Sequence, residues 1–97
     1  MTYSFHPDAE TEFFEAIEYY EDQGDEIGLT FSREVFAGVK RIMNFPMAWS
    51  PFSGRSRPCL VKRFPYGIVY RLTEDQIIIY AVMHLNRKPG YWLDRLK

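Results

Sequence analysis

The chain has 97 residues, a formal net charge of -1 and an aromatic content of 18%, a length that accommodates one domain rather than two. A chain of this size has a modest hydrophobic core, to which large aromatic side chains contribute much of the buried area. The single cysteine, Cys59, excludes an internal disulfide, and the longest apolar run, Ile77 to Met83, is far too short to span a bilayer. Because the N-terminus also lacks a basic and apolar leader, we expect a cytoplasmic protein with no membrane association.

The charged residues are divided unevenly between the two halves of the chain. Residues 1–50 carry three cations and ten carboxylates, a balance of -7, whereas residues 51–97 carry nine cations and three carboxylates, a balance of +6. Such a separation is typical of a protein that presents one face to an anionic partner. An acidic helical surface and a basic sheet edge that are both merely solvated would give the same numbers, so charge leaves both interpretations open.

The N-terminal half predicts a short strand over residues 3–5 and then a helical hairpin over about residues 8–45. We expect Asp8 to cap the first helix, which has apolar residues at helical spacing and ends near Gly24. A second helix is predicted over about residues 25–44, where apolar residues recur every three or four positions. The outward face of the first helix should be solvated, because it carries Glu12, Glu15, Glu18 and Glu21.

Beyond a loop rich in proline and serine, the periodicity changes from that of helices to that of strands. Three β-branched and aromatic runs within about residues 58–84 predict an antiparallel meander, followed by a C-terminal tail over residues 85–97. The strand that ends at His84 is apolar on both alternating sets, which is typical of a strand covered on both faces. The turn between the first two strands has two or three residues, and this choice decides whether Arg63 and Arg71 share a face.

The predicted order of elements is therefore β-α-α-β-β-β within a single domain, residues 1–97. This order indicates an α+β fold in which the helical hairpin packs on a small twisted antiparallel sheet.

Cations in the second half lie on segments that are neighbours in a meander, with aromatic residues among them. Cations interleaved with rings suit contacts with phosphates and stacking on bases. We therefore expect a binding surface built from Arg57, Lys62, Arg63, Arg71, Lys88 and Trp92. Arg55 belongs to the same run of cations, whereas Tyr70 and Tyr80 are assigned to packing. Paired cysteines or histidines and a glycine-rich phosphate loop are missing from the sequence, so we expect neither a metal nor a cofactor.

His84 follows the most apolar strand and precedes Arg87 and Tyr91. A histidine can act as general acid or base near neutral pH, and an arginine stabilises charge on a phosphorus centre. Together these residue types suit metal-free RNA cleavage, which needs a base, an acid and cations at the phosphate. Alternatively, His84 bonds to the backbone and holds the junction between strand and tail. Residue type and position leave both roles open.

The segments from His6 to Gln23 and from Val61 to Trp92 resemble the RelE/ParE superfamily of bacterial toxins from type II toxin–antitoxin modules. The resemblance covers nearly the whole chain. It rests on Pro7, Ala9, the pair Tyr19-Tyr20, the run RFPYGIVYR, and His84, Arg87, Pro89, Tyr91 and Trp92. It implies the β-α-α-β-β-β fold, growth arrest, a role in plasmid stabilisation, and neutralisation by a cognate antitoxin. The antitoxin would wrap the toxin with an acidic or amphipathic segment, which would suit the basic half and cover the doubly apolar strand.

The superfamily that the chain resembles has two functional branches. ParE-like members inhibit DNA gyrase without chemistry of their own, and RelE-like members cleave ribosome-bound mRNA. The run FPYGIVYR and the antiparallel helices look ParE-like, whereas His84, Arg87 and Tyr91 lie near where RelE-like members have their active site. We favour inhibition of DNA gyrase. The alternative is a metal-free, ribosome-dependent mRNA endonuclease with His84, Arg87 and Tyr91 as its catalytic residues.

Overall fold

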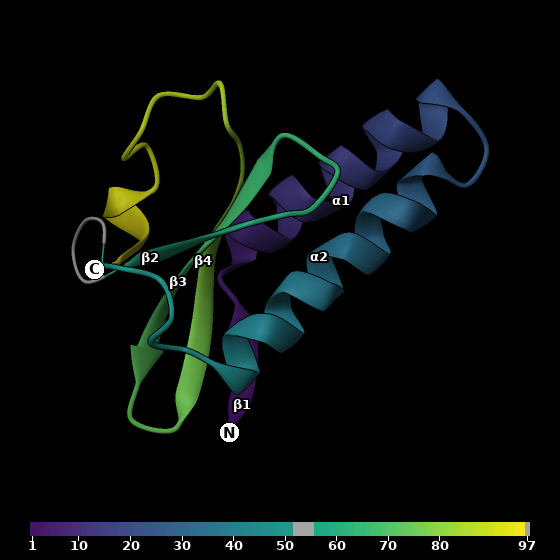
Figure 1. Ribbon diagram of the computed structural model, residues 1–97. Coiled ribbons are helices and arrows are strands. Elements are labelled where there is room, and N and C mark those ends of the chain that lie inside the picture. The colour runs from purple at the N-terminus through teal and green to yellow at the C-terminus, as the bar shows by residue number, and fades with distance from the viewer. Residues whose placement is uncertain (52–55, 97) are drawn as a thin grey trace.

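The computed structural model describes residues 1–51 and 56–96, which form a four-stranded sheet with helices on one side and the C-terminal segment on the other (Figure 1). In chain order the elements are β1 (Thr2–Phe5), α1 (Pro7–Gln23), α2 (Ile27–Asn44), β2 (Arg57–Leu60), β3 (Tyr66–Thr73), β4 (Gln76–His84) and the 3₁₀ helix η1 (Leu93–Leu96). The predicted α+β class and the predicted order of strands and helices are confirmed. Arg55 lies outside the described residues.

The strands are arranged in the order β1-β4-β3-β2. Strands β2, β3 and β4 form the predicted antiparallel meander, but β1 pairs in parallel with β4, so the sheet is mixed. Parallel neighbours require a long crossover connection, which the helical hairpin and two strands supply here. Because β1 is short, it reaches only from Gln76 to Ile79 along β4.

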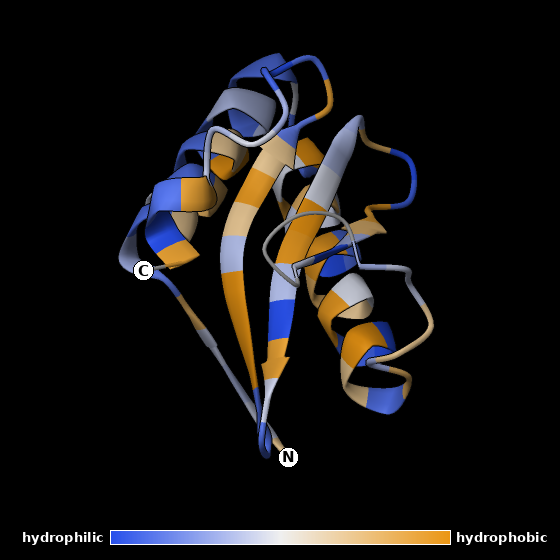
Figure 2. Cartoon of the chain, turned by 90° about the vertical axis from the view of Figure 1, so that its left-hand side faces the viewer, coloured by the Kyte–Doolittle hydropathy of each residue, from blue (hydrophilic) through white to orange (hydrophobic). Residues whose placement is uncertain are grey.

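One apolar face of each helix packs against the sheet. The buried core on this side is built from Ala9, Phe13, Ala16, Phe31, Val35, Val39, Ile42, Ile68, Tyr70, Ile77 and Ile79. Figure 2 shows the apolar character of the two central strands. Tyr70 and Tyr80 are both buried, as the sequence predicted. Within residues 1–51 and 56–96, the helices lack the combination of length and apolar character needed to cross a membrane.

The two helices approach each other closely at Gly28. A Cβ atom at this position would lie 2.8 Å from the backbone oxygen of Ile17 on α1. Real Cβ atoms do not approach a backbone oxygen so closely, and packed interiors do not absorb such overlap without movement. The close approach of α1 and α2 therefore depends on glycine at position 28.

The start of α1 differs from the prediction. His6, not Asp8, is the N-cap, because its Nδ1 accepts the backbone N–H of Asp8 at 3.1 Å. Asp8 lies instead in the first turn, where a carboxylate is favoured by the positive end of the helix dipole. Gly24 ends α1 as expected, and the left-handed residue of the turn is Glu26, with φ of 69°.

Strand β4 contains a β-bulge at Tyr80. Val69 of β3 lies beside Ala81, but the next residue, Tyr70, lies beside Ile79, so Tyr80 is an extra residue on β4. A bulge inverts the alternation of side chains beyond it. The strand therefore directs Ile79 and then Val82 toward the helices, and His84 emerges on the same side.

The second face of the sheet is covered by the chain itself. Trp92 is fully buried and packs with Val69 of β3 and Ala81 of β4, and Leu96 of η1 packs against the same cluster. This finding corrects two expectations. Trp92 presents no side-chain surface to a partner, and the cover of the doubly apolar strand is supplied by the C-terminal tail rather than by an antitoxin.

The connection between β2 and β3 is longer than the two or three residues that the sequence suggested. Strand β2 ends at Leu60, and β3 begins at Tyr66. Arg63 therefore lies in a turn, with φ of 72°, rather than on either face of the sheet. Arg71 lies on β3 and alternates with the helix-facing Tyr70 and Leu72, so it faces away from the helices.

Candidate functional site

Glu12 of α1 is the centre of a hydrogen-bonded cluster that joins the helix to the tail. Its carboxylate accepts the hydroxyl of Tyr91 at 2.7 Å, the guanidinium of Arg95 at 2.8 and 3.0 Å, and that of Arg87 at 3.2 Å. The Glu12 side chain is only 12% exposed. The prediction of a solvated glutamate face is therefore wrong for Glu12, although it holds for the other three residues, which are exposed: Glu15, Glu18 and Glu21.

Glu12 and Arg95 also occupy the outer edge of β4 beyond the end of β1. Glu12 accepts the backbone N–H of Val82 at 3.1 Å, and Arg95 donates to the backbone oxygen of Tyr80 at 2.9 Å. These side chains satisfy backbone groups that a longer β1 would otherwise pair. The cluster thus stabilises the charges of Glu12 and Arg95 through several charge-assisted hydrogen bonds.

The sequence carried a signal for the burial of Glu12. It lies three residues after Ala9 and four before Ala16, both of which are buried on the core face of α1. Residues with this spacing are neighbours on a helix. A carboxylate at the border of the apolar stripe was therefore a candidate for a paired, partly buried charge, but its partners lie about 80 residues away and local spacing could not name them.

Tyr91 contacts charged groups both at its hydroxyl and at its ring. Burial raises the pKa of its hydroxyl well above the ordinary value, and the hydrogen bond to Glu12 raises it further. The guanidinium carbon of Arg87 lies 3.6 Å from the centre of the Tyr91 ring, the geometry of a cation–π contact. Tyr91 therefore stays protonated near neutral pH and acts as a hydrogen-bond donor to Glu12.

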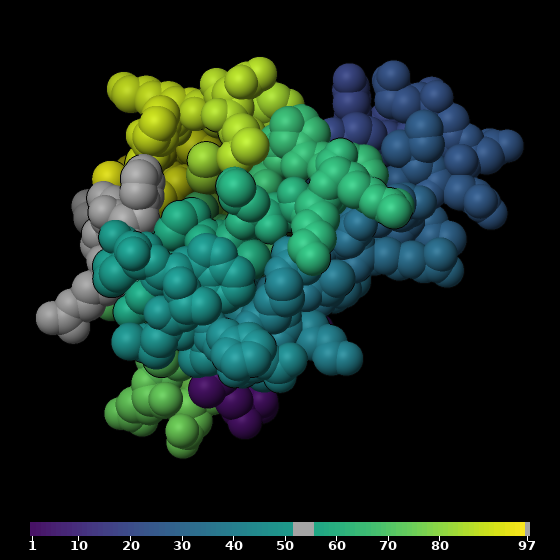
Figure 3. Space-filling model, in the orientation of Figure 1, coloured from purple at the N-terminus to yellow at the C-terminus, as the bar shows by residue number. Residues whose placement is uncertain are grey.

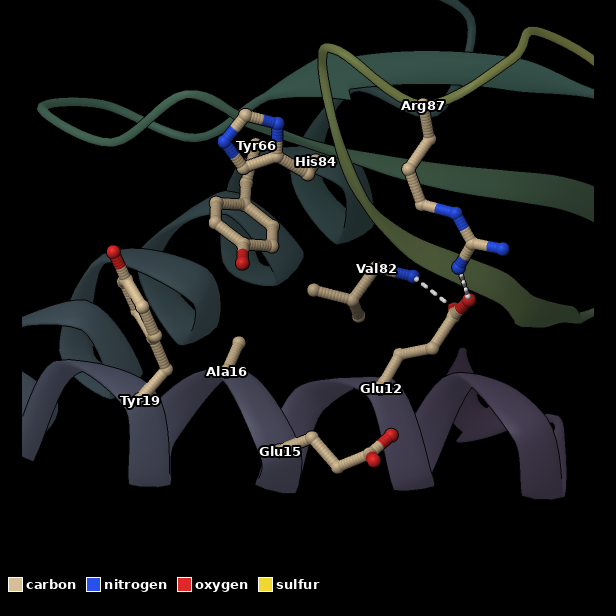
Figure 4. A pocket seen from close by; sticks show the side chains of 8 residues that line it. All are labelled: Glu12, Glu15, Ala16, Tyr19, Tyr66, Val82, His84 and Arg87. Atoms are coloured by element: carbon tan, nitrogen blue, oxygen red, sulfur yellow. Dashed lines mark hydrogen bonds and ion pairs between the residues drawn. The ribbon is translucent and has the colours of Figure 1, made fainter.

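A groove of about 290 Å³ runs between α1 and the ends of β3 and β4 (Figure 4). It is lined by Glu12, Glu15, Ala16, Tyr19, Tyr66, Val82, His84 and Arg87. In Figure 4, Tyr19 and Tyr66 lie at one end, and Glu12 points toward Arg87 at the other. The groove is thus aromatic at one end and charged at the other.

His84 lies in this groove and also closes the turn that follows β4. Its Nδ1 accepts the backbone N–H of Asn86 at 3.0 Å, and its backbone oxygen accepts the N–H of Arg87 at 3.0 Å. Its ring meets Tyr66 edge to face, with centroids 5.2 Å apart. His6 makes the same bond to the backbone two residues ahead. His84 therefore has a structural role at the junction between strand and tail.

The structure brings together the three candidate catalytic residues, with Glu12 among them. Arg87 and Tyr91 both bind the Glu12 carboxylate, and His84 lines the groove that Glu12 also lines. A phosphate that approached Arg87 would meet this carboxylate, and like charges in proximity repel each other. The arrangement therefore suits fixation of the tail better than recognition of a phosphate.

The residues predicted as a binding surface are dispersed. Arg57 donates to the backbone oxygen of Trp49 and to Sδ of Met47, and Arg63 pairs with Glu34 of α2 at 3.5 Å. Trp92 is buried, and Arg71 faces away from the helices. Among the six predicted residues, two are exposed and form no ion pair within the described part of the chain: Lys62 and Lys88.

The two oppositely charged halves of the chain neutralise each other in part. Each of the four ion pairs that join two described residues links a carboxylate of the first half to an arginine of the second: Glu34 to Arg63, Glu12 to Arg87 and Arg95, and Asp8 to Arg95. Part of the charge separation seen in the sequence is therefore used within the fold rather than by a partner.

Comparison with known proteins decides the family. The family model described as the ParE toxin of the type II toxin–antitoxin system parDE matches residues 3–89. This chain belongs to the ParE toxin family. It is 35% identical over 86 residues to Toxin ParE2 of Mycobacterium tuberculosis, in strains CDC 1551 / Oshkosh and ATCC 25618 / H37Rv, which covers 88% of this chain and 82% of the relative.

A solved structure supports the ParE fold independently. The chromosomal ParDE TA system from P. aeruginosa matches with a TM-score of 0.69 and 15% identity, over 87% of this chain and 95% of the other. The resemblance to a toxin of type II toxin–antitoxin systems is thus confirmed, and membership of the ParE family implies an antitoxin partner. The matched residues 3–89 include Glu12, His84 and Arg87 but end before Tyr91 and Arg95.

Proposed function

We propose that this ParE-family toxin acts on DNA gyrase, as its ParE-like resemblance implies, and that it does so without cutting RNA. Membership of the ParE family supports the choice of gyrase, and the observation that argues against RNA cleavage is the position of Glu12. Its carboxylate binds Tyr91 at 2.7 Å and Arg87 at 3.2 Å, so two of the three candidate catalytic groups are already paired.

Metal-free cleavage of RNA needs cations that are free to stabilise the phosphorane and groups that exchange protons near neutral pH. Arg87 is partly neutralised by Glu12. The raised pKa of Tyr91 means that its hydroxyl gives up its proton with difficulty, so it is a poor general acid and rarely forms the phenolate that a general base would need. His84 uses the lone pair of Nδ1 for the backbone of Asn86. These three contacts support a toxin that binds its target rather than one that transforms it.

We further propose that the protein acts in the cytoplasm and that its antitoxin binds with an acidic or amphipathic segment. Lys62 and Lys88 are exposed, and Arg71 lies on the side of the sheet away from the helices. Of the six residues predicted from the sequence, these three cations remain candidates for contacts with an acidic segment.

An mRNA endonuclease is the second candidate function. The bulge at Tyr80 directs His84 into the groove beside α1, where Arg87 also lies. Bulges frequently re-aim side chains next to active sites. This observation favours a test in which the acid–base capacity of His84 is removed while its structural bond is kept.

The test expresses the chain without its antitoxin as wild type, His84→Asn and His84→Ala. Asparagine places an acceptor near the position of Nδ1 and also bonds to the backbone two residues ahead, so His84→Asn keeps the turn and removes the imidazole. We expect His84→Asn to remain toxic and to cause gyrase-dependent DNA breaks with intact mRNA. His6→Asn is the matched control, because His6 makes the same bond but does not line the groove.

A nuclease would give a clearly different result. Breaks in translated mRNA that disappear in His84→Asn, with folding and antitoxin binding unchanged, would overturn the gyrase proposal and establish the nuclease. Inhibition of DNA supercoiling by the purified protein, measured with gyrase at increasing toxin concentration, gives the direct readout of the proposed target.

A further inference from the structure

The outer face of the helical hairpin carries an exposed apolar patch. Phe14 of α1 is 56% exposed, and Phe36 of α2 is 45% exposed. Both rings contact the buried ring of Phe13, with centroid distances of 6.0 and 5.4 Å. The two exposed rings therefore flank one buried ring, and they form a patch across the two helices. Exposed aromatic clusters of this kind mark interaction surfaces.

Charges of opposite sign border this patch on its two sides. On α1, which has no cation, Phe14 lies between Glu10 and Glu18, each four residues away. We call these two carboxylates the acidic row. On α2, Phe36 is bordered by a basic row, three residues before it and four after it: Arg33 and Lys40. All four charged residues are exposed, and none of them forms an ion pair with another residue in the described part of the chain.

We propose that this face binds a second copy of the same chain. A two-fold rotation that places α1 of one copy on α2 of the other brings each acidic row against a basic row, twice in one interface. The paired phenylalanines then meet at the centre, with a charged rim around them. A rotation that placed α1 on α1 would instead bring carboxylates against carboxylates. The charge pattern thus selects one orientation of a symmetric dimer.

The pattern also argues against other partners. The acidic row would repel nucleic acid, and a peptide with charges of one sign would suit one row and be repelled by the other. The hairpin is accessible, because its tip projects beyond the rest of the molecule (Figures 1 and 3). Two such hairpins packed face to face form a four-helix arrangement, which is a common solution for burying apolar stripes.

The experiment measures association of the purified full-length chain by sedimentation velocity across a range of concentrations. One variant, Arg33→Glu with Lys40→Glu, makes both rows acidic, and a second, Glu10→Lys with Glu18→Lys, makes both rows basic. Each variant alone should dimerise at least about tenfold more weakly than wild type. An equimolar mixture of the two should recover association, because each acidic row then faces a basic row.

The control variant is Lys62→Glu with Lys88→Glu, which changes the net charge by the same amount as the first variant but lies outside the hairpin. It should dimerise like wild type. A wild-type chain that stays monomeric, or variants whose mixture associates no better than either one, would overturn the proposal. Loss of antitoxin binding in Arg33→Glu with Lys40→Glu, together with a monomeric wild type, would assign the face to the antitoxin instead. The result does not depend on the toxin's target, since gyrase is absent from the assay.

Discussion

The carboxylate of Glu12 and the guanidinium of Arg95 lie 2.8 Å apart, although 83 residues separate them in the chain. This contact joins the first helix to the C-terminal segment and supplies hydrogen bonds to the open edge of β4. Burial opposes the charge of Arg95, but the hydrogen bond and charge of Glu12 outweigh this effect and raise its pKa. The pair therefore fixes where the tail runs, and with it the cover of the second face of the sheet.

Replacement of Glu12 by alanine should lower the free energy of unfolding by about 3 kcal/mol, because it leaves partly buried arginines without their carboxylate. Denaturation by urea, followed by circular dichroism, measures the change. Glu15→Ala is the matched control, since Glu15 is exposed on the same helix and lies outside the acidic row, and it should change stability by less than about 0.5 kcal/mol. Equal effects of the two substitutions would contradict the role assigned to Glu12.

Replacement of Trp92 by alanine should destabilise the fold by about 3–5 kcal/mol, the range for removal of a large buried ring. The cavity would uncover Val69 and Ala81, which Trp92 covers. Thermal unfolding provides the measurement. Leu93→Ala is the control, because Leu93 is the adjacent residue and is 40% exposed. A Trp92→Ala protein as stable as the control would show that the tail does not cover the sheet.

Gly28→Ala should destabilise the helical hairpin, although alanine is favoured over glycine inside a helix by about 1 kcal/mol. The added Cβ would collide with the backbone oxygen of Ile17, and overpacking of this kind costs about 1–3 kcal/mol. Gly38→Ala is an internal comparison. Its Cβ would lie 2.8 Å from Cδ1 of Ile68, the end of a flexible side chain that can move. In chemical denaturation, Gly28→Ala should have a lower free energy of unfolding than Gly38→Ala. The reverse order would refute the close contact between Gly28 and Ile17.

The stability of the protein should fall in alkaline solution because of Tyr70. Burial raises the pKa of its hydroxyl from 10.0 to about 12, and the hydroxyl donates to the backbone oxygen of Pro46 at 2.7 Å. A group whose pKa is higher in the folded state contributes stability that is complete below the unfolded pKa and is lost as the pH rises through the folded pKa. The loss should therefore occur between pH 10 and about pH 12.

Unfolding by urea at about pH 9 and about pH 11 measures this dependence. Tyr70→Phe removes the ionisable group and the bond to Pro46, so its stability should be lower near neutral pH but should fall less over the same interval. Tyr91, which is partly buried, contributes a change in the same direction, because its pKa is also raised. A Tyr70→Phe variant with the full alkaline loss would attribute the dependence to other groups.

Much of the fold could be predicted because it depends on local patterns. The spacing of Ala9, Phe13 and Ala16 indicates a helix with one buried face, and the β-branched run before His84 indicates a strand. The candidate site was predicted only in part. The neighbourhood of His84, Arg87 and Tyr91 follows from their closeness in the sequence, but the carboxylate among them comes from the far end of the chain.

Glu12 and Trp92 illustrate what local patterns miss. A glutamate on a helix that carries other exposed glutamates gives the same pattern whether it is solvated or paired with a distant arginine. A tryptophan beside cations likewise suits a binding surface as well as it suits the core. Their burial depends on the path of the tail, residues 85–96, which places Trp92 against Val69 and Ala81 of the sheet and Arg95 against Glu12.

By itself, the sequence determined the order of the helices and strands, the resemblance to the RelE/ParE superfamily and the opposite charges of the two halves. Periodicity and turn chemistry act over a few residues, so they can be read along the chain. Only the tertiary structure decided that part of those charges pair with each other, that His84 turns toward α1 and that the tail closes the second face. Each of these depends on the register of β3 and β4 and on the bulge at Tyr80, which orient side chains that are remote in sequence.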